Sequence, residues 1–445
     1  MVTTMSARRR RALTSLAVLA GSAVALTGCG LSNSSSGAAS SSKALTVWHQ
    51  FSGEGAGAMD VVISDYNKKN PDAKFKGRSI ANDEANTVVR TGLSGNNPPT
   101  VLQYEGYQQT KDFVKAGQLL DITDWYNQHV DDFTYGDSQA VKDACEVDGK
   151  MYCIPWNVDT SEQLFINPDI MSQYSLTAPK TVDDLKAIAG TLKGTGINPV
   201  SLYAGDGWPA AHWWFLLTIQ RCSVDTIVAA ANQDGAKWDD PCFLQSAQDL
   251  YDIGQAGVFP QGVEGQDYNA MLQLFLSGKA ALMNTGTWFN ATLADKATKP
   301  KFETEAVAFP QVDPAKPSQQ ILGGFTNVFG LPANSGNTDA GLKFLDYIAD
   351  PANGAGAKFA KTGLVNVIIG ADKEMEPRVK ASYDAIAAAL ALPGNNVIAY
   401  FENLVPPSVG EDIMYNGTAA LTSGSMKPQD YVTQLQQAAE AAAAG

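Results

Sequence analysis

The stretch Leu45-Thr-Val-Trp-His49, followed by apolar residues at helical spacing over 59–66, decides the fold class. The five residues are β-prone, whereas apolar side chains at intervals of three and four form one face of a helix. Asn70-Pro71 then ends that helix, because proline cannot continue it. A strand followed directly by a helix is the repeating unit of α/β folds.

Further strand and helix signals alternate along the chain. Pro98-Pro99 introduces a second strand, Thr100-Val-Leu-Gln-Tyr104, and the capping-box pattern Thr181-Val-Asp-Asp184 opens a helix whose apolar face runs to residue 192. An Ala-, Gln- and Glu-rich segment over 430–444 predicts a last helix. The alternation predicts an α/β protein with mostly parallel sheets. A chain of 445 residues is too long for one small core, so we expect two lobes.

The N-terminus has the pattern of an export signal. Arg8 to Arg11 precede an apolar or small-residue run of 15 over 12–26, which is too short to span a membrane. Leu26-Thr-Gly-Cys29 resembles the bacterial lipobox, which implies cleavage of residues 1–28 and a lipid on Cys29; an ordinary cleavage site is the alternative. A Ser/Gly/Ala-rich tether over 29–43 would follow. We therefore expect a lipid-anchored protein on the extracellular face of the bacterial membrane, with both the general and twin-arginine export routes open.

The charge balance limits the classes of partner. The formal net charge is −14, and −18 once the four leader arginines are removed. Nucleic acids and anionic membrane surfaces both need clustered Lys and Arg, so neither is expected to bind. Beyond the leader, no run approaches eighteen uninterrupted apolar residues, so no membrane-spanning helix is expected.

Four cysteines are left after Cys29, and an even number outside the cytoplasm predicts two disulfides. The segment between Cys145 and Cys153 is centred on an Asp-Gly turn, which would bring its two ends together. We therefore favour Cys145–Cys153 and Cys222–Cys242. The chain has only three His, none in a ligand pattern with the cysteines, so neither a metal nor a cofactor is expected.

A series of segments, taken in order, resembles the sugar-binding solute-binding proteins of ABC importers, the class that includes maltose-binding protein. The segments are Leu45–His49 with Phe51–Gly53, Asp60–Pro71, Pro98–Gln103, Asp148–Tyr152 with Ile154-Pro155, Phe165–Asn167, Pro179–Leu185, Phe275–Met283 with Gly286-Thr-Trp288, Gly323-Gly324 and Gly363–Val367. Their order and spacing cover nearly all of residues 44–440. One departure is Thr100, where the family typically has Asp after the Pro, so no role is carried over there.

The resemblance implies two α/β lobes of the type II periplasmic-binding-protein fold, joined by crossing hinge strands and closing on one ligand. The family's chain path places one lobe at 44–157 plus 323–372 and the other at 158–322 plus 373–440. The implied function is capture of a mono- or oligosaccharide and its delivery to the transmembrane subunits of an ABC permease, by a protein that we expect to be monomeric.

A sugar site needs planar polar groups for hydroxyls and aromatic rings for C–H faces. Residues of these types lie at strand ends and crossovers, where open α/β sheets bind ligands. The candidates are His49, Gln50, Tyr104, Glu105, Tyr107, Asn157, Asp159, Trp208, Trp214, Trp288, Gly324, Phe325 and Glu411. Several of these positions, Trp288 and Glu411 among them, are implied by the resemblance. Trp48, in the middle of a strand, is instead predicted to be core.

Three tryptophans lie within Ala204-Gly-Asp-Gly-Trp-Pro-Ala-Ala-His-Trp-Trp214. Trp208 follows a Gly-Asp-Gly sequence and precedes proline, so we expect it in a loop at the ligand. Trp213 and Trp214 are adjacent on the following helix and therefore point about 100° apart. We expect one of this pair in the core and Trp214 to be the less buried.

Two other functions compete with sugar binding. A phosphorylated polyol such as glycerol 3-phosphate could occupy the same fold, but it would need cationic groups or helix-terminal amides, and the candidate loops are acidic and aromatic. An exported glycosidase would need paired carboxylates, for which Asp159 and Glu105 could be proposed. No hydrolase motif accompanies them, and spare carboxylates are common in an acidic protein, so the sequence does not favour an enzyme.

Overall fold

A computed structural model describes residues 44–51, 53–161, 163–295, 298–316, 320–391 and 396–444, which belong to one compact unit. The predicted signal peptide, the lipidation site at Cys29 and the tether lie outside the described residues. In the part of the chain that is described, no helix has the length and apolar character needed to cross a bilayer.

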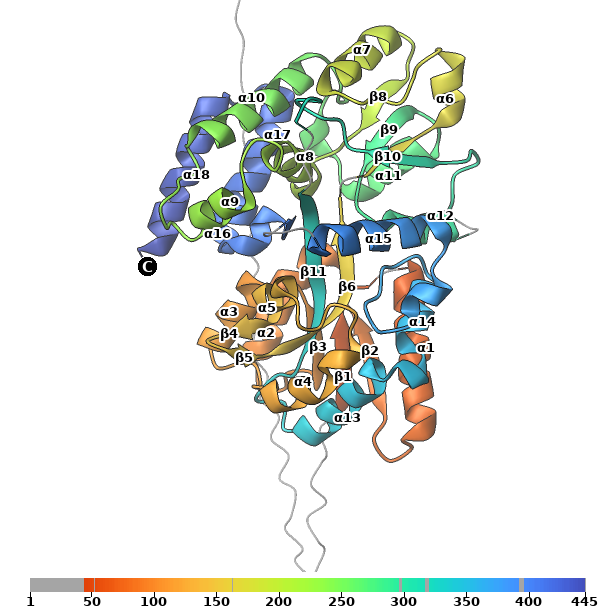
Figure 1. The fold of residues 1–445 in the computed structure, drawn as a ribbon, viewed down its shortest axis with the longest axis vertical. Helices are drawn as coiled ribbons and strands as arrows, with labels where there is room; N and C mark the ends of the chain where they lie inside the picture. The colour runs from red at the N-terminus through yellow and green to blue at the C-terminus, as the bar shows by residue number, and fades with distance from the viewer. Residues whose placement is uncertain are drawn as a thin grey trace, which may run out of the picture. The chain divides into compact units, whose positions relative to one another are not determined.

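The first sheet has six strands, in the order β12-β11-β3-β1-β2 with β6 paired to β11 (Figure 1). Its strands are β1 (Leu45–His49), β2 (Phe75–Ser79), β3 (Val101–Tyr104), β6 (Cys153–Thr160), β11 (Ile321–Gly330) and β12 (Val397–Ile398). Strand β1 pairs in parallel with both β2 and β3, and helix α1 (Gly53–Lys69) makes the crossover from β1 to β2. Helix α1 ends directly before Asn70-Pro71, as the sequence predicts.

Helices surround this sheet and complete the first hydrophobic core. They are α2 (Asn82–Ser94), α3 (Gln108–Lys115), α4 (Thr123–His129), α5 (Gln139–Cys145), α13 (Thr338–Ala349) and α14 (Ala355–Ala360). The predicted apolar face of α1 over 59–66 is buried in this core, which confirms that face. Trp48 is half-buried against the same core, with the Arg78 guanidinium 4.3 Å from the centroid of its ring.

The second sheet has four strands in the order β10-β7-β9-β8. They are β7 (Gln163–Ile166), β8 (Asn198–Ser201), β9 (Ala280–Asn284) and β10 (Glu305–Ala308). Only β8 and β9 are parallel, whereas β7 is antiparallel to both β9 and β10. The prediction of mostly parallel sheets is therefore wrong for this lobe. The alternation of strands and helices along the chain does not decide which strands become neighbours, and β7 lies between β9 and β10, neither of which follows it through a single helical crossover.

The second core is formed largely by helices. They are α6 (Pro168–Gln173), α7 (Val182–Leu192), α8 (Trp208–Thr218), α9 (Val224–Ala231), α10 (Pro241–Gln255), α11 (Tyr268–Leu276), α12 (Phe289–Ala294), α16 (Pro407–Val409), a π-helical turn (Gly410–Tyr415), α17 (Asn416–Ser423) and α18 (Pro428–Ala443). The capping box of Thr181 and Asp184 is present at the start of α7. Helix α18 confirms the predicted last helix.

Helix α8 corrects two predictions about the tryptophans. Trp213 and Trp214 both have 0% exposure, so Trp214 is core and not the less buried of the pair. They do face different neighbours, since Trp213 packs on Phe259 and Trp214 packs on Trp238. The prediction failed because α8 is buried on every side, with all of residues 209–218 inside the lobe. Trp208 is the first residue of this helix rather than a loop residue.

Strands β6 and β11 run antiparallel to each other and connect the two cores (Figure 1). Their pairing is tightest at Gly323, where φ is +138° and a Cβ would lie 1.9 Å from the Asp159 carbonyl oxygen. Gly324 has φ +128°, and a Cβ there would lie 2.5 Å from the Tyr107 hydroxyl oxygen. Gly323 is thus required by the close packing of β11 on β6, and Gly324 by the Tyr107 hydroxyl beside it. The expected approach of a ligand to Gly324 stays a prediction.

We expect Gly323→Ala to lower the free energy of unfolding by about 2 kcal/mol, because alanine is strained at this φ and its Cβ would push the strands apart. Urea denaturation of the purified protein measures the change. Gly265→Ala is the matched control, since a Cβ there meets no atom within 4 Å. Equal stability of the two variants would contradict this account of the crossing strands.

The two cores divide the chain close to the predicted lobe boundaries. The first core uses residues from 47–158 and 325–386 with Ala399, and the second uses residues from 164–322 and 398–439. Helix α15 (Pro377–Ala391) departs from the predicted boundaries: it was expected in the second lobe but contributes Val379 and Ile386 to the first core. That the two lobes move relative to each other about these boundaries stays a prediction.

Both predicted disulfides are present, Cys145–Cys153 and Cys222–Cys242. The first closes a hairpin of β4 (Glu146–Val147) and β5 (Lys150–Met151), whose turn has positive φ at Asp148 and Gly149. Positive φ at both central residues is the turn geometry that an Asp-Gly pair predicts. The second bridge joins the segment before α9 to the first turn of α10.

Candidate functional site

Three half-buried aromatic side chains from separate segments of the second lobe meet in one group. Trp208 begins α8, Tyr268 begins α11 and Trp288 directly precedes α12. The Trp208 ring centroid lies 4.8 Å from that of Tyr268 and 5.6 Å from that of Trp288. The indole Nε1 of Trp288 donates a hydrogen bond of 3.0 Å to the Tyr268 hydroxyl. We call these three residues the aromatic cluster.

The Gly205-Asp206-Gly207 turn determines how the aromatic cluster is assembled. The Asp206 carboxylate accepts a 2.8 Å hydrogen bond from the backbone N–H of Tyr268, which ties the start of α11 to the start of α8. Gly207 has φ +78°, and a Cβ there would collide with the Tyr415 side chain. The glycine thus allows Tyr415 to pack directly beside the first turn of α8.

A hydrogen-bonded chain of side chains lies next to the aromatic cluster. Glu402, on the 3-10 turn Phe401–Leu404, has Oε1 3.3 Å from His212 Nε2, and His212 Nδ1 lies 3.3 Å from Ser161 Oγ. The His212 ring stacks on Tyr400 at 4.2 Å and lies 5.0 Å from Trp208.

The order Ser161, His212, Glu402 is that of a serine nucleophile with its base and acid, but the serine is not placed for attack. Ser161 has 0% exposure, and its Oγ also lies 2.9 Å from the Tyr400 hydroxyl. A nucleophile must reach its substrate. The hydrogen bonds from Ser161 to His212 and from His212 to Glu402 therefore serve to orient the imidazole and the carboxylate.

Four carboxylates from both lobes lie close enough to affect one another. Glu105 follows β3, Asp159 is in β6, Glu402 is on the 3-10 turn and Glu411 is in the π-helical turn. The pKa of Glu105 is raised to about 8, mainly by burial and then by the charges of Glu402, Glu411 and Asp159. The pKa of Glu411 is also raised, by burial and by Asp412, while Arg90 opposes the shift.

Asp159 has its carboxylate oxygens already engaged. Thr326 and Asn327 donate to Oδ2 over 3.4 Å and 2.5 Å, and Thr287 donates to Oδ1 over 3.5 Å. Burial raises the pKa of Asp159 to about 6, against the lowering effect of these hydrogen bonds. Because Asn327 is on β11, Asp159 ties the two crossing strands together.

Glu411 takes part in a polar contact between the lobes. Its carboxylate accepts a hydrogen bond from the Asn86 amide on α2, and Asn86 Oδ1 accepts from Gln109 Nε2 over 2.9 Å. The three residues come from α2, α3 and the π-helical turn. A π-turn inside a helix is often found at functional sites, because it redirects side chains.

The structure brings five of the predicted residues into this region: Glu105, Asp159, Trp208, Trp288 and Glu411. Three predicted aromatic residues are core instead. Tyr104 has 0% exposure and its hydroxyl lies 3.3 Å from Thr110 Oγ1, and Phe325 and Trp214 also have 0% exposure. Their predicted contact with a ligand is wrong, because no part of their rings is accessible.

Asn157 is on the crossing strand β6, Gln50 follows β1, and His49 ends β1 with its ring stacked 5.6 Å from that of Phe51, so none of the three belongs to the aromatic cluster. The backbone N–H of Gln50 donates to Gln103 Oε1 over 2.6 Å, and Gln103 in turn donates to Asn327 over 2.8 Å. The Asn157 Oδ1 accepts from Asn366 over 3.4 Å. His49 is 2% exposed, and burial lowers its pKa. None of the three has an observed contact with the aromatic cluster, so their ligand roles stay predictions.

Sequence reasoning missed Tyr268, His212, Glu402 and Tyr415. Tyr268 had a usable signal, since it opens a helix behind N-capping Asp267, much as Trp208 opens a helix behind Gly207. Glu402 had no such sequence signal, because it lies on an irregular turn and is 190 residues from its partner His212.

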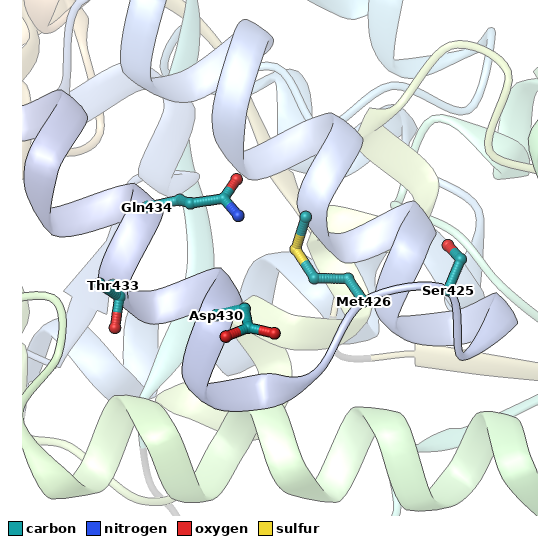
Figure 2. A pocket seen from close by; sticks show the side chains of 5 residues that line it. All are labelled: Ser425, Met426, Asp430, Thr433 and Gln434. Carbon is teal, nitrogen blue, oxygen red and sulfur yellow. The ribbon is translucent and has the colours of Figure 1, made fainter.

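A hollow on the surface of the second lobe lacks the aromatic and acidic side chains of the candidate site. It lies at the turn between α17 and α18 (Figure 2) and is lined by Ser425, Met426, Asp430, Thr433 and Gln434. Its lining includes no aromatic ring and a single carboxylate. Among the described residues, no group of three or more His, Cys, Asp or Glu is arranged to hold a metal ion.

Comparison with known proteins gives one family. The family model described as bacterial extracellular solute-binding protein matches residues 50–355. An uncharacterised ABC transporter extracellular-binding protein of Pyrococcus horikoshii is 23% identical over 311 residues, covering 68% of this chain and 67% of that protein. A probable sugar-binding periplasmic protein of Mesorhizobium japonicum is 24% identical over 270 residues, covering 60% and 63%.

Another relative is named for a different ligand. The sn-glycerol-3-phosphate-binding periplasmic protein of Shigella flexneri is 26% identical over 359 residues, covering 76% of this chain and 75% of that protein.

Solved structures share the fold over almost their whole length. A structure from work on xylan utilisation by Caldanaerobius polysaccharolyticus has a TM-score of 0.79 at 24% identity, covering 88% of this chain and 99% of that one. The structure of the SBP RafE in complex with raffinose has a TM-score of 0.69 at 17% identity, covering 88% of this chain and 98% of that one. These similarities establish a two-lobed fold of the type II periplasmic binding proteins for this chain.

Proposed function

This chain belongs to the bacterial extracellular solute-binding proteins, and on that premise we propose that it captures a mono- or oligosaccharide for an ABC importer. The observation that carries the proposal is the aromatic cluster of Trp208, Tyr268 and Trp288, with Glu402 held next to it by His212. Aromatic faces match the C–H faces of a sugar, and carboxylates accept hydrogen bonds from its hydroxyls.

In the proposed mechanism, sugar binding favours the closed arrangement of the lobes. Glu105 comes from the first lobe, and the aromatic cluster comes from the second. A ligand that contacts both binds more tightly to the closed form and shifts the population toward it. Strands β6 and β11 are the connection about which the lobes would move. The surface of the closed form is then what the transmembrane subunits of the importer recognise.

The setting of the protein is part of the proposal. The lipobox at Leu26-Thr-Gly-Cys29 supports a lipid anchor on Cys29, and the tether over 29–43 would hold the lobes at the extracellular face of the bacterial membrane. One binding site per monomer is sufficient for this role, and it requires no catalysis or cofactor.

Glycerol 3-phosphate is the second candidate ligand, because of the Shigella flexneri relative. A phosphate would need unpaired cationic groups. Among the described residues, Arg90 is the guanidinium that acts on Glu411, and its Nη2 is already paired with Asp112 at 3.0 Å. The local charges therefore favour a sugar without phosphate.

A thermal-shift screen tests the proposal. We expect one sugar in a panel of mono- and oligosaccharides to raise the melting temperature saturably, because a ligand that binds only the folded form stabilises it by about 2.7 kcal/mol at 100 times Kd. A shift with sn-glycerol 3-phosphate and with no sugar would contradict it.

We expect Trp208→Ala to weaken binding of that sugar about tenfold, since the variant removes one ring of the aromatic cluster. Isothermal titration calorimetry measures the change. Trp125→Ala is the control, because Trp125 is another half-buried tryptophan but lies on α4, bonded to Asp346. Equal affinities for the two variants would remove Trp208 from the site.

A further inference from the structure

Two half-buried side chains from different lobes form a direct hydrogen bond. Asn86 lies on α2, next to Ala85 of the first hydrophobic core. Glu411 lies in the π-helical turn, two residues after Val409 of the second core. The Asn86 Nδ2 donates to the Glu411 carboxylate. The bond therefore exists only while the two lobes are together at this place, and we call Asn86 and Glu411 the interlobe pair.

The first lobe holds Asn86 in the orientation that this bond needs. Gln109 Nε2, on α3, donates to Asn86 Oδ1 over 2.9 Å, which leaves the Nδ2 hydrogens for the carboxylate. Arg90 lies one turn further along the same face of α2. Burial and Asp412 raise the pKa of Glu411, and the charge of Arg90 opposes that shift. The first lobe thus presents both a donor and a positive charge to an acceptor of the second lobe.

The second lobe places Glu411 beside the aromatic cluster. The π-helical turn that carries Glu411 ends at Tyr415. The Tyr415 side chain packs on Gly207, which directly precedes Trp208. The contact between the lobes therefore forms next to the proposed ligand surface.

The hydrogen bond gives Glu411 a role other than the one expected from sequence. The resemblance implies that Glu411 contacts the ligand, and the structure gives its carboxylate another partner, the Asn86 amide of the other lobe. A bond that forms only when the lobes are together favours the closed arrangement, whatever ligand is bound. A hydrogen bond to a charged group contributes more than one between neutral groups, and partial exposure to solvent reduces that contribution.

We propose that the interlobe pair is a latch, which stabilises the closed arrangement of the lobes and so raises the affinity for the sugar without touching it. This inference rests on the proposed function. The apparent affinity of a protein that must close is its intrinsic affinity multiplied by the fraction of molecules that are closed. Loss of the latch lowers that fraction by one factor, the same for every ligand that requires closure. A residue that touches the sugar affects only those ligands that carry the group it touches.

Calorimetric titration of Asn86→Ala tests the latch. We expect about a five- to tenfold loss of affinity for the sugar found in the thermal-shift screen, as for the loss of one hydrogen bond at a partly exposed site. Analogues of that sugar that each lack one hydroxyl should lose the same factor, to within about twofold. Asn353→Ala is the matched control, because Asn353 is also half-buried but its amide donates to Tyr347 and Asp350 within the first lobe. This control should keep the original affinity.

A double-mutant cycle shows whether the two residues act together. Glu411→Ala breaks the same hydrogen bond from the other lobe. The double variant should therefore lose no more affinity than the weaker-binding single variant. Losses that multiply in the double variant would show that the two residues act separately and would overturn the latch. A cooperative urea transition shows that each variant is folded.

The other outcomes separate the latch from sugar capture. If Asn86→Ala binds the sugar as tightly as the original protein does, the latch is wrong and sugar capture stands. If an analogue that lacks one hydroxyl binds equally to Asn86→Ala and to the original protein, Asn86 touches that hydroxyl, and the latch is again overturned. If no sugar binds the original protein, sugar capture itself is contradicted, and the latch fails with it.

Discussion

Trp214→Ala is expected to lower the free energy of unfolding by about 3–5 kcal/mol, the usual cost of removing a large aromatic side chain from a core. Trp214 has 0% exposure. Its ring packs edge-on against Tyr431 at 5.1 Å and Phe401 at 5.9 Å, and tilted against Trp238 at 6.2 Å. These partners come from α18, from the 3-10 turn and from the loop before α10. The substitution would therefore leave a cavity where several elements of the second lobe meet.

Urea denaturation followed by far-UV circular dichroism measures this loss. Trp125→Ala is the matched control, because the same substitution at a half-buried position leaves a much smaller cavity. If Trp214→Ala were no more destabilising than Trp125→Ala, the assignment of Trp214 to the core would be contradicted.

Trp288→Ala is expected to weaken sugar binding about a hundredfold, or about 2.7 kcal/mol, as for a central aromatic anchor of a binding site. Trp288 is half-buried and packs against both hydrophobic cores. Its indole also holds the Tyr268 hydroxyl through the 3.0 Å hydrogen bond, so its removal would release a second ring of the aromatic cluster. Two of the three rings are thus affected by one substitution.

Calorimetric titration with the sugar found in the screen measures this effect. Trp288→Phe should recover part of the affinity, because it keeps a ring but not the indole N–H. A cooperative unfolding transition in Trp288→Ala shows that the variant is folded. A folded Trp288→Ala that binds with the affinity of the original protein would remove Trp288 from the site.

The first lobe was the more predictable from sequence, because its elements follow local patterns. The run 45–49, the apolar face over 59–66 and the break at Asn70-Pro71 each act within a few residues. Strand β1, helix α1 and its end were accordingly predicted correctly. The Asp148-Gly149 turn was predictable for the same reason, since the positive φ of both residues is a local requirement.

Burial was harder to predict, since it depends on which elements cover a side chain. The sequence gives Trp213 and Trp214 different directions on α8, and their neighbours in the structure do differ. The signal that α8 is covered on every side was present but not used, since WPAAHWWFLLT is apolar on all faces apart from His212 and Thr218, and a helix of that kind is buried. Tyr104 illustrates the same point, because a tyrosine at a strand end was expected at the ligand, whereas its ring lies in the core against Phe113.

The types of residue at the candidate site were easier to predict from sequence than the individual residues and their contacts. Trp208 and Glu105 were proposed because aromatic and acidic residues in loops and at strand ends are typical of sugar sites, and Trp288 was proposed from the resemblance. Their contacts with a ligand stay predictions. Glu402 and its partner His212 could not be found, since a contact between residues 190 apart leaves no local pattern.

The central claim is that one sugar is held by groups of both lobes, and calorimetric titration of Glu105→Gln and Trp288→Ala tests it most directly. Glu105 is on the first lobe and Trp288 is on the second. The account predicts one site per chain in the original protein and at least about a tenfold loss of affinity in each folded variant. A sugar that binds both variants as tightly as the original protein would contradict the claim.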